Sequence, residues 1–239
     1  LNNYNSGLFT FGDGASRNLA YTIGLTRNNK GLNPIYPMYG SEFSVTAKFT
    51  PPYSLFNNVD YANLGDVEEN KYKYTGTAYT YINDNNVNVL VNPGDYLSEI
   101  PSSTNLYPSA KVSSFEDAAA DPGKVDQIKY KWLEYYKVKF KADWYTKIYD
   151  KLVLRSLGEF GFMGAYNQDR GLVPFERFYL GGDGLANYSL DGRETIQLRG
   201  YPNNSLSSTD GGTIFNKFSL ELRYPITLKS SASIYALSF

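Results

Sequence analysis

The sequence predicts an all-β fold, and more specifically part of a transmembrane antiparallel β-barrel. Three observations lead to this prediction. Apolar and polar residues alternate along several segments, long and short connections alternate between those segments, and aromatic residues bracket an apolar band of roughly membrane height. Side chains on successive strand residues point to opposite faces, so each alternating segment is expected to form a strand with one apolar and one polar face.

The alternating segments account for about six or seven strands. The clearest are residues 18–26, 42–49, 136–144 and 214–224, with weaker examples at 151–166 and 231–239. Helical periodicity is nearly absent. Too few strands are present to close a barrel around a wet interior, and an unpaired strand edge in lipid is costly. We therefore expect residues 1–239 to be a partial outer-membrane β-barrel domain, with further strands outside the chain.

The connections between these segments differ greatly in length. Those at 28–40, Tyr149-Asp150 and Lys229-Ser230 are short, whereas 51–131 and 167–212 are long. Short and long connections alternate along the chain, which puts the long ones at one end of the sheet. Outer-membrane barrels combine long external loops with short periplasmic turns in this way, and compact soluble domains rarely carry two irregular connections of this size.

The segment 132–148 gives the height of the apolar band. Tyr136 and Trp144 lie eight residues apart, which corresponds to a rise of roughly 20 Å at ~3.3 Å per residue and a tilt of ~40°. The membrane band of such barrels is about 25 Å tall, with aromatic girdles at both edges. We expect one face of this strand to meet lipid and the other to face the lumen; the lipid-facing residues are Tyr136, Val138, Phe140 and Trp144, and the lumenal ones are Lys137, Lys139 and Lys141.

A soluble, aromatic-rich β-sandwich would have a similar composition. The lysine-rich face argues against it, because a dry sandwich core does not accept unpaired charges. A solvated lumen wall is the simplest interpretation of the three lysines, and an anion-selective ladder is the alternative.

Composition excludes several classes of function. The chain has 23 basic and 24 acidic residues, so no strong charge favours a nucleic-acid partner. Cysteine and histidine are absent, which removes thiol nucleophiles, thiolate metal sites and the commonest general base. We expect no enzyme activity, no metal and no cofactor.

Residues 167–212 contain the most informative motif. The run Val173-Pro174-Phe175-Glu176-Arg177-Phe178-Tyr179-Leu180-Gly181-Gly182 is followed by Leu198-Arg199-Gly200-Tyr201. An isolated Arg-Gly-Tyr would be typical of an exposed loop turn. The combination, however, resembles the BamA family of outer-membrane assembly factors, within the outer-membrane insertase superfamily.

The resemblance is carried by particular residues. Pro174, Phe175, Phe178, Tyr179, Gly181 and Gly182 match the family's Pro-Phe and Phe-Tyr-x-Gly-Gly, and Arg199, Gly200 and Tyr201 match the Val-Arg-Gly-Phe/Tyr tip of its sixth external loop. Leu198 replaces the usual valine, and Asp183–Thr195 lengthens the stretch between the two parts. The turn Tyr36–Ser41 and the strand segment Phe218–Glu221 also resemble the family.

The resemblance implies an arrangement of the barrel. The chain would run from about strand eight to strand thirteen of sixteen, with 51–131 as an enlarged external loop and 167–212 as an external loop that folds into the lumen. The tip arginine, Arg199, would meet acidic residues of the inner wall. Glu221 is at the matching position, and the period-two count also puts it on the polar face. The alternative is local pairing of Glu221 with Arg223 or Lys217.

Details of the tip follow from the same resemblance. Gly200 would allow a tight tip that a side chain would obstruct, and Tyr201 would pack against the inner wall. A second acidic residue of the family pattern would fall just beyond Phe239.

The resemblance also implies a function. The protein would be the barrel subunit of the outer-membrane protein assembly machinery, the BAM complex of Gram-negative bacteria, with POTRA domains outside this chain. Its partners would be outer-membrane lipid, client β-barrel proteins and other subunits of the complex. The alternatives are a passive transport barrel, such as a porin or receptor, and a superfamily relative that exports one secreted partner. The tyrosine-rich stretch 71–91 is interpreted either as a partner-docking hairpin or as a self-packed loop.

Overall fold

The chain folds as two compact units in a computed structural model. The described residues are 15–31, 33, 35–102, 104–107, 111, 114–173, 176–182, 194–203, 205–208, 210–229 and 232–239. The sheet unit comprises Asn18–Pro52, Glu134–Tyr166 and Leu172–Phe239. The loop unit comprises Tyr53–Leu133 and Asn167–Gly171, with the described end of Leu1–Arg17.

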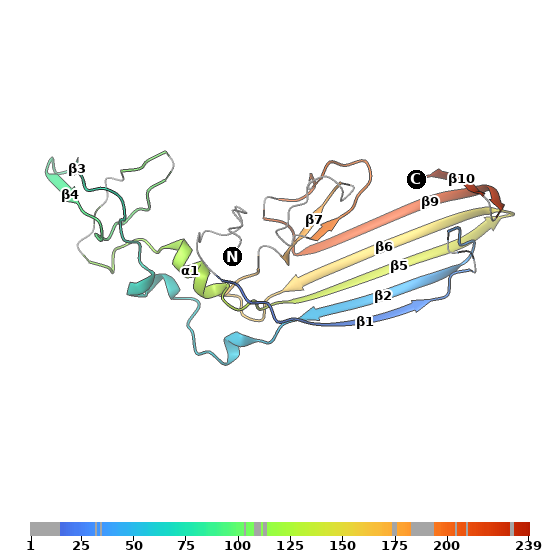
Figure 1. Cartoon of the computed structure of the whole chain (residues 1–239), viewed down its shortest axis with the longest axis horizontal. Coiled ribbons are helices and arrows are strands. Elements are labelled where there is room, and N and C mark those ends of the chain that lie inside the picture. Colours follow the sequence, from blue (N-terminus) through green and yellow to red (C-terminus); the bar gives the residue numbers. More distant parts are fainter. Residues whose placement is uncertain are drawn as a thin grey trace. The chain divides into compact units, whose positions relative to one another are not determined.

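The sheet unit contains one antiparallel sheet of six strands (Figure 1). The strands are β1 (Tyr21–Asn28), β2 (Gly40–Phe49), β5 (Tyr136–Tyr149), β6 (Leu152–Gly164), β9 (Ile214–Lys229) and β10 (Ala232–Ser238). They lie in the order β1-β2-β5-β6-β9-β10, so strands that follow one another in this sheet are also hydrogen-bonded neighbours. All six predicted strands are confirmed. In the described residues the sheet is open, with β1 and β10 at its two edges.

The pairing register gives the sheet one continuous apolar face. Leu25 pairs with Val45, Val45 with Phe140, and Phe140 with Phe160, so one apolar row crosses four strands. These side chains are exposed in the chain by itself, and so is Phe218 on β9, at 81%. A contiguous apolar face that is exposed in the chain by itself is typical of a surface that lipid or another protein covers.

The short connections lie at one end of the sheet and the long connections at the other, as the alternation of their lengths predicts. Tyr149 of β5 pairs with Leu152 of β6 across the turn Asp150-Lys151, where Asp150 adopts a positive φ of 43°. At the other end Tyr136 pairs with both Phe49 and Gly164, the last residues of β2 and β6. Both long connections therefore leave the sheet at the same end.

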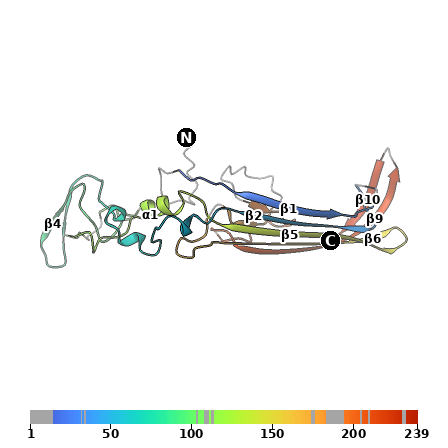
Figure 2. The same cartoon turned by 90° about the horizontal axis from the view of Figure 1, so that it is seen from below.

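Strand β9 extends beyond its neighbour β6. Pairing with β6 ends at Val153–Arg223, whereas pairing with β10 continues to Lys229. Pro225 lacks a backbone N–H and pairs with Tyr235, next to an irregularity in the register between Ile234 and Tyr235. The end of the β9–β10 hairpin bends out of the plane of the other strands (Figure 2).

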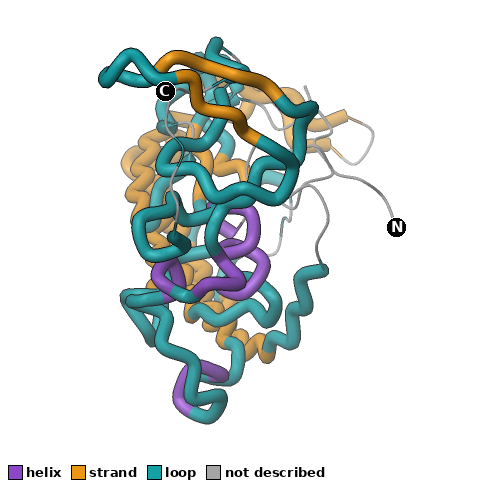
Figure 3. The backbone as a smooth tube through the Cα atoms, turned by 90° about the vertical axis from the view of Figure 1, so that its left-hand side faces the viewer, coloured by secondary structure: helices purple, strands orange, loops and turns teal. Residues whose placement is uncertain are grey.

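The loop unit contains several short elements (Figure 3). They are 3-10 helices Tyr53–Leu55, Leu64–Asp66 and Glu68–Asn70, the hairpin β3 (Tyr79–Ile82) and β4 (Asn88–Val91), and helix α1 (Pro122–Lys129). Helix α1 begins at Asp121, whose carboxylate accepts hydrogen bonds from the N–H groups of Gly123 and Lys124. In the described residues no helix is both long and apolar enough to cross a membrane.

The tyrosine-rich hairpin packs on its own unit. Tyr74, Val91 and Leu97 form a buried cluster, and three partly buried tyrosines pack against it: Tyr72, Tyr79 and Tyr81. This agrees with the self-packed interpretation of residues 71–91. Docking of a partner at its exposed side stays a prediction.

Candidate functional site

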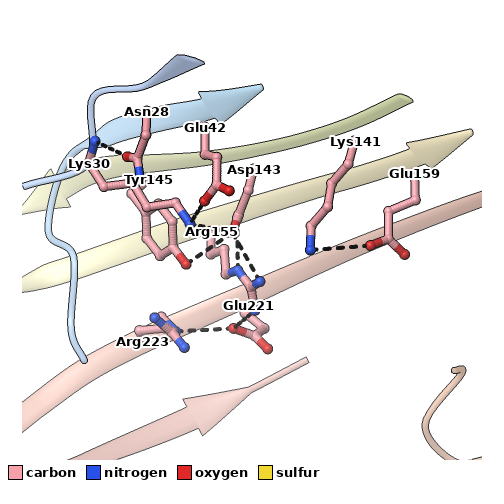
Figure 4. Close-up of polar contacts among 10 residues, drawn as sticks. All are labelled: Asn28, Lys30, Glu42, Lys141, Asp143, Tyr145, Arg155, Glu159, Glu221 and Arg223. Carbon is pink, nitrogen blue, oxygen red and sulfur yellow. Dashed lines mark hydrogen bonds and ion pairs between the residues drawn. The ribbon is translucent and has the colours of Figure 1, made fainter. Parts of the chain in front are cut away.

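A row of alternately negative and positive side chains crosses the polar face of the sheet near the end with the short turns (Figure 4). Arg155 of β6 donates two hydrogen bonds to Asp143 of β5, from Nε at 2.8 Å and from Nη2 at 3.1 Å. Its Nη1 donates to Oε2 of Glu221 on β9 at 3.2 Å, and Arg223 Nε donates to the same oxygen at 3.0 Å. Bidentate arginine–carboxylate pairs fix both distance and orientation. These four side chains thus connect three strands.

A second row of charges lies further from the turns. The register pairs Lys141 with Glu159, and Glu159 with Lys217. The ammonium groups lie 3.6 Å and 2.9 Å from the Glu159 carboxylate. Opposite charges directly across neighbouring strands attract, whereas like charges repel. Lys141 therefore has a carboxylate partner, which it shares with Lys217.

One part of the polar face has an excess of positive charge. Lys48 of β2 pairs in register with Lys137 of β5, and Lys139 follows on the same face. The described part of the connection 167–212 supplies the missing carboxylates. Glu176 accepts a hydrogen bond from Lys48 at 2.8 Å, and Glu194 accepts one from Lys139 at 2.9 Å and pairs with Lys137.

The Lys137 side chain is only 3% exposed, so its charge needs these partners. Its ammonium donates to the Glu176 carbonyl at 2.8 Å and lies 4.4 Å from the Phe178 ring centroid. We call Glu176 and Glu194, with the lysines Lys48, Lys137 and Lys139, the base clamp of this loop.

The base clamp continues into an aromatic contact on the same face. Phe178 is 1% exposed and packs edge-on against Phe215 of β9, with ring centroids 4.7 Å apart. Gly161 of β6 lies beneath both rings. A Cβ at this position would overlap the Phe215 ring and approach Cζ of Phe178 to 3.0 Å. Glycine at 161 therefore lets the loop lie close to the wall.

Two short strands order the loop above this contact. Strand β7 (Phe178–Leu180) pairs in parallel with β8 (Glu194–Ile196). Gly181 and Gly182 follow with φ values of 114° and 92°, and a Cβ on Gly181 would approach the Pro202 carbonyl oxygen to 2.6 Å. The Phe-Tyr-x-Gly-Gly motif thus combines two buried rings with two positions that a side chain would strain.

The tip residues differ from the expected arrangement in their contacts. The Arg199 guanidinium lies 4.3 Å from the centroid of the Phe239 ring, a cation–π contact. Among the described residues the ion-pair partners of Glu221 are Arg155 and Arg223. Pairing of Glu221 with Arg223 is the local alternative that the sequence left open.

Two further residues of the tip were expected to have particular roles. Tyr201 is 49% exposed in the chain by itself, so its packing against the inner wall of a complete barrel stays a prediction. Among the described residues no atom lies within 4 Å of the position a Gly200 Cβ would take, so the contacts there do not account for this glycine. Its φ of 89° does, because this region of backbone space is accessible to glycine and costly for other residues.

The other residues singled out in the sequence are the remaining loop-motif positions and the two faces of β5. Phe178 and Tyr179 are both 1% exposed, whereas Pro174 and Phe175 lie outside the described residues. Tyr136, Val138, Phe140 and Trp144 share the apolar face, opposite Lys137, Lys139 and Lys141.

Sequence reasoning missed the partners that hold the loop, notably Glu194 and Gly161. The available signal was Lys48 opposite Lys137, a like-charge pair for which the described residues of the six-stranded sheet offer no carboxylate partner.

The pKa of the Glu194 carboxyl group is lowered in the folded protein. Burial alone would raise the pKa of its carboxyl group, but hydrogen bonds and attraction from Lys137 and Lys139 prevail and hold that pKa below the ordinary value of 4.5. The folded loop therefore favours the ionised form of Glu194.

A first prediction concerns the fit of the loop against β6. Gly161→Ala should destabilise the full-length protein by about 1–3 kcal/mol, because the added methyl group overlaps Phe215 and displaces Phe178. Unfolding in lipid vesicles and protease cleavage within 167–212 measure both effects. Gly158→Ala on the same strand is the control, since its Cβ would meet Phe218 at an ordinary 3.6 Å. Equal behaviour of the two variants would contradict the role of Gly161.

A second prediction concerns pH. Because the Glu194 pKa is depressed in the folded protein, its stabilisation of the loop is fully present above about pH 4.5 and is lost as pH falls through the folded pKa. A spin label attached at Gln197→Cys should become more mobile over that acidic range. Glu194→Gln should abolish this pH dependence. An unchanged pH profile in that variant would assign the transition to another group.

Comparison with known proteins agrees with this geometry. The model of the Omp85 superfamily domain matches residues 118–239, just over half of the chain. No curated protein sequence matches the chain. Proteins of this superfamily are non-enzymatic barrels that serve membrane assembly or transport. The chain belongs to the Omp85 superfamily of outer-membrane β-barrel proteins.

Proposed function

We propose that this chain is part of the barrel subunit of an outer-membrane protein assembly factor of the BamA type, which inserts and folds β-barrel proteins. The observation that carries the proposal is the loop 167–212. Its Phe-Tyr-x-Gly-Gly motif packs on the polar face of the sheet through Phe178 and the base clamp, and an Arg-Gly-Tyr tip follows. A loop so attached to the wall is suited to hold its tip at a defined depth.

In the proposed arrangement the six strands are about strands eight to thirteen of a sixteen-stranded barrel. The continuous apolar face meets the lipid, and the charged face lines the lumen. Residues 51–131 form an enlarged external loop, and 167–212 an external loop that folds into the lumen. The open edges at β1 and β10 support this, because further strands must pair with them in a membrane.

The proposed mechanism separates two parts of the barrel. The seam between its first and last strands accepts the edge of a client strand by β-augmentation, helped by local thinning of the bilayer. The wall described above is the opposite, closed side. Its role is to hold the loop while the seam opens, in contact with outer-membrane lipid, client barrels and other subunits of the complex.

Within that mechanism Arg199 acts as a latch. The candidate carboxylate on the wall is Glu221, which Arg155 and Arg223 already bind. Both arginines donate to Oε2, so the second oxygen of this carboxylate is the acceptor proposed for Arg199. The cation–π contact with Phe239 is the alternative holding point.

A passive transport barrel is less well supported. The wall lysines share their carboxylate partners, as Lys141 and Lys217 share Glu159, and the loop lies on part of the polar face, which leaves less of that face to line an open solute path. POTRA domains in the full-length protein would favour assembly or export of one secreted partner, whereas a plug domain would favour transport.

A third prediction tests the latch. Arg199→Ala in the full-length protein should lower the level of client outer-membrane proteins several-fold and sensitise cells to large antibiotics, while the mutant protein itself stays near normal abundance. The barrel should persist because its strand pairing and apolar face are untouched. Lys151→Ala, an exposed lysine in the β5–β6 turn, is the control. Wild-type client folding rates in Arg199→Ala would remove the latch role.

A further inference from the structure

We propose that the connection between β1 and β2 is a strap that crosses the lumenal face and narrows the barrel at its short-turn end. The strap consists of the described residues 29–31, 33 and 35–39. The inference requires only that the polar face lines a lumen, and it does not depend on the assembly role proposed above.

The burial of Tyr36 carries the inference. The connection joins two neighbouring strands at one edge of the sheet, yet Tyr36 is 0% exposed and forms a buried cluster with Tyr145 of β5 and Val153 of β6. Its ring also lies 5.4 Å from the ring of Tyr235 on β10, centroid to centroid. The strap therefore reaches from the β1–β2 edge across the sheet to its last strand.

The cluster lies on the charged face. Tyr145 pairs in register with Arg155, and its hydroxyl donates to the Asp143 carboxylate at 3.2 Å. Met38 and Leu228 pack against the same cluster and enlarge it. An apolar cluster on an otherwise charged wall displaces water from that part of the lumen.

A buried arginine holds the rings together. The Arg223 guanidinium lies 5.6 to 5.7 Å from the ring centroids of Tyr36, Tyr145 and Tyr235. Glu221 supplies its counter-charge at 3.0 Å. Cation–π contacts are strongest where water is excluded, so the strap and Arg223 stabilise each other.

Hydrogen bonds and ion pairs of the strap's own residues fix its path. The Asn33 side-chain oxygen accepts hydrogen bonds from the N–H groups of Ile35 and Tyr36, both at 3.0 Å, which orders the turn before the tyrosine. Gly31 N–H donates to the Tyr39 carbonyl at 3.0 Å. Lys30 pairs with Glu42 and with Asp143, the latter at 3.5 Å. The strap is thus tied to the wall at more than one point.

The test is the ion permeability of the purified full-length protein in lipid bilayers, without any client. Tyr36→Ala should raise conductance several-fold, because it removes the ring that spans the cluster. Tyr36→Phe should conduct as wild type, because the buried Tyr36 hydroxyl has no hydrogen-bond partner in the described residues. Tyr39→Ala is the matched control, since Tyr39 lies on the same connection and is 60% exposed.

A second measurement covers the case in which Tyr36→Ala fails to fold. The chain has no cysteine, so paired substitutions report proximity cleanly. Tyr36→Cys with Tyr235→Cys should be joined in the outer membrane by a bifunctional thiol reagent long enough to replace the two rings, and Tyr39→Cys with Tyr235→Cys should be joined far less. Wild-type conductance in folded Tyr36→Ala, or a missing Tyr36–Tyr235 crosslink, would overturn the strap. A defect in client assembly at unchanged conductance would also count against it.

Discussion

Paired charges on the polar face of the sheet are the interaction on which the rest of the structure depends. A strand with one apolar and one charged face can be stable only if each charge finds a partner or water. Here Arg155 forms ion pairs with both Asp143 and Glu221, and Glu159 forms ion pairs with Lys141 and Lys217. Most of these partners face each other directly across neighbouring strands, so the register that aligns the apolar face also aligns the charges.

The same constraint explains why the long loop lies on the wall. Lys48 and Lys137 oppose each other with like charge, and the described residues of the six-stranded sheet offer them no carboxylate partner. The loop carboxylates Glu176 and Glu194 complete the pairing, and the glycine at 161 makes room for the accompanying aromatic ring. Fold and candidate site are therefore parts of one electrostatic arrangement, in which the wall is incomplete without the loop.

Sequence reasoning predicted the elements with local signals and missed those that depend on contacts across the fold. Alternation identified all six strands of the main sheet, and connection lengths gave the ends of the sheet. Helix α1 is only eight residues long, and its one local signal is Asp121-Pro122 at its start. Gly200 was singled out through its motif, and the structure adds its φ of 89°, which a spacing pattern does not reveal. Tyr36 and Glu194 have distant partners, which periodicity does not reveal.

The most direct test of the account is the environment of two adjacent residues on β5. In the full-length protein in its membrane, Phe140→Cys should react with lipid-soluble thiol reagents and resist water-soluble ones, because its face meets the bilayer. Lys141→Cys, on the opposite face, should show the reverse preference. Water-soluble labelling of Phe140→Cys together with lipid-phase labelling of Lys141→Cys would contradict the assignment of the two faces, and with it the membrane barrel.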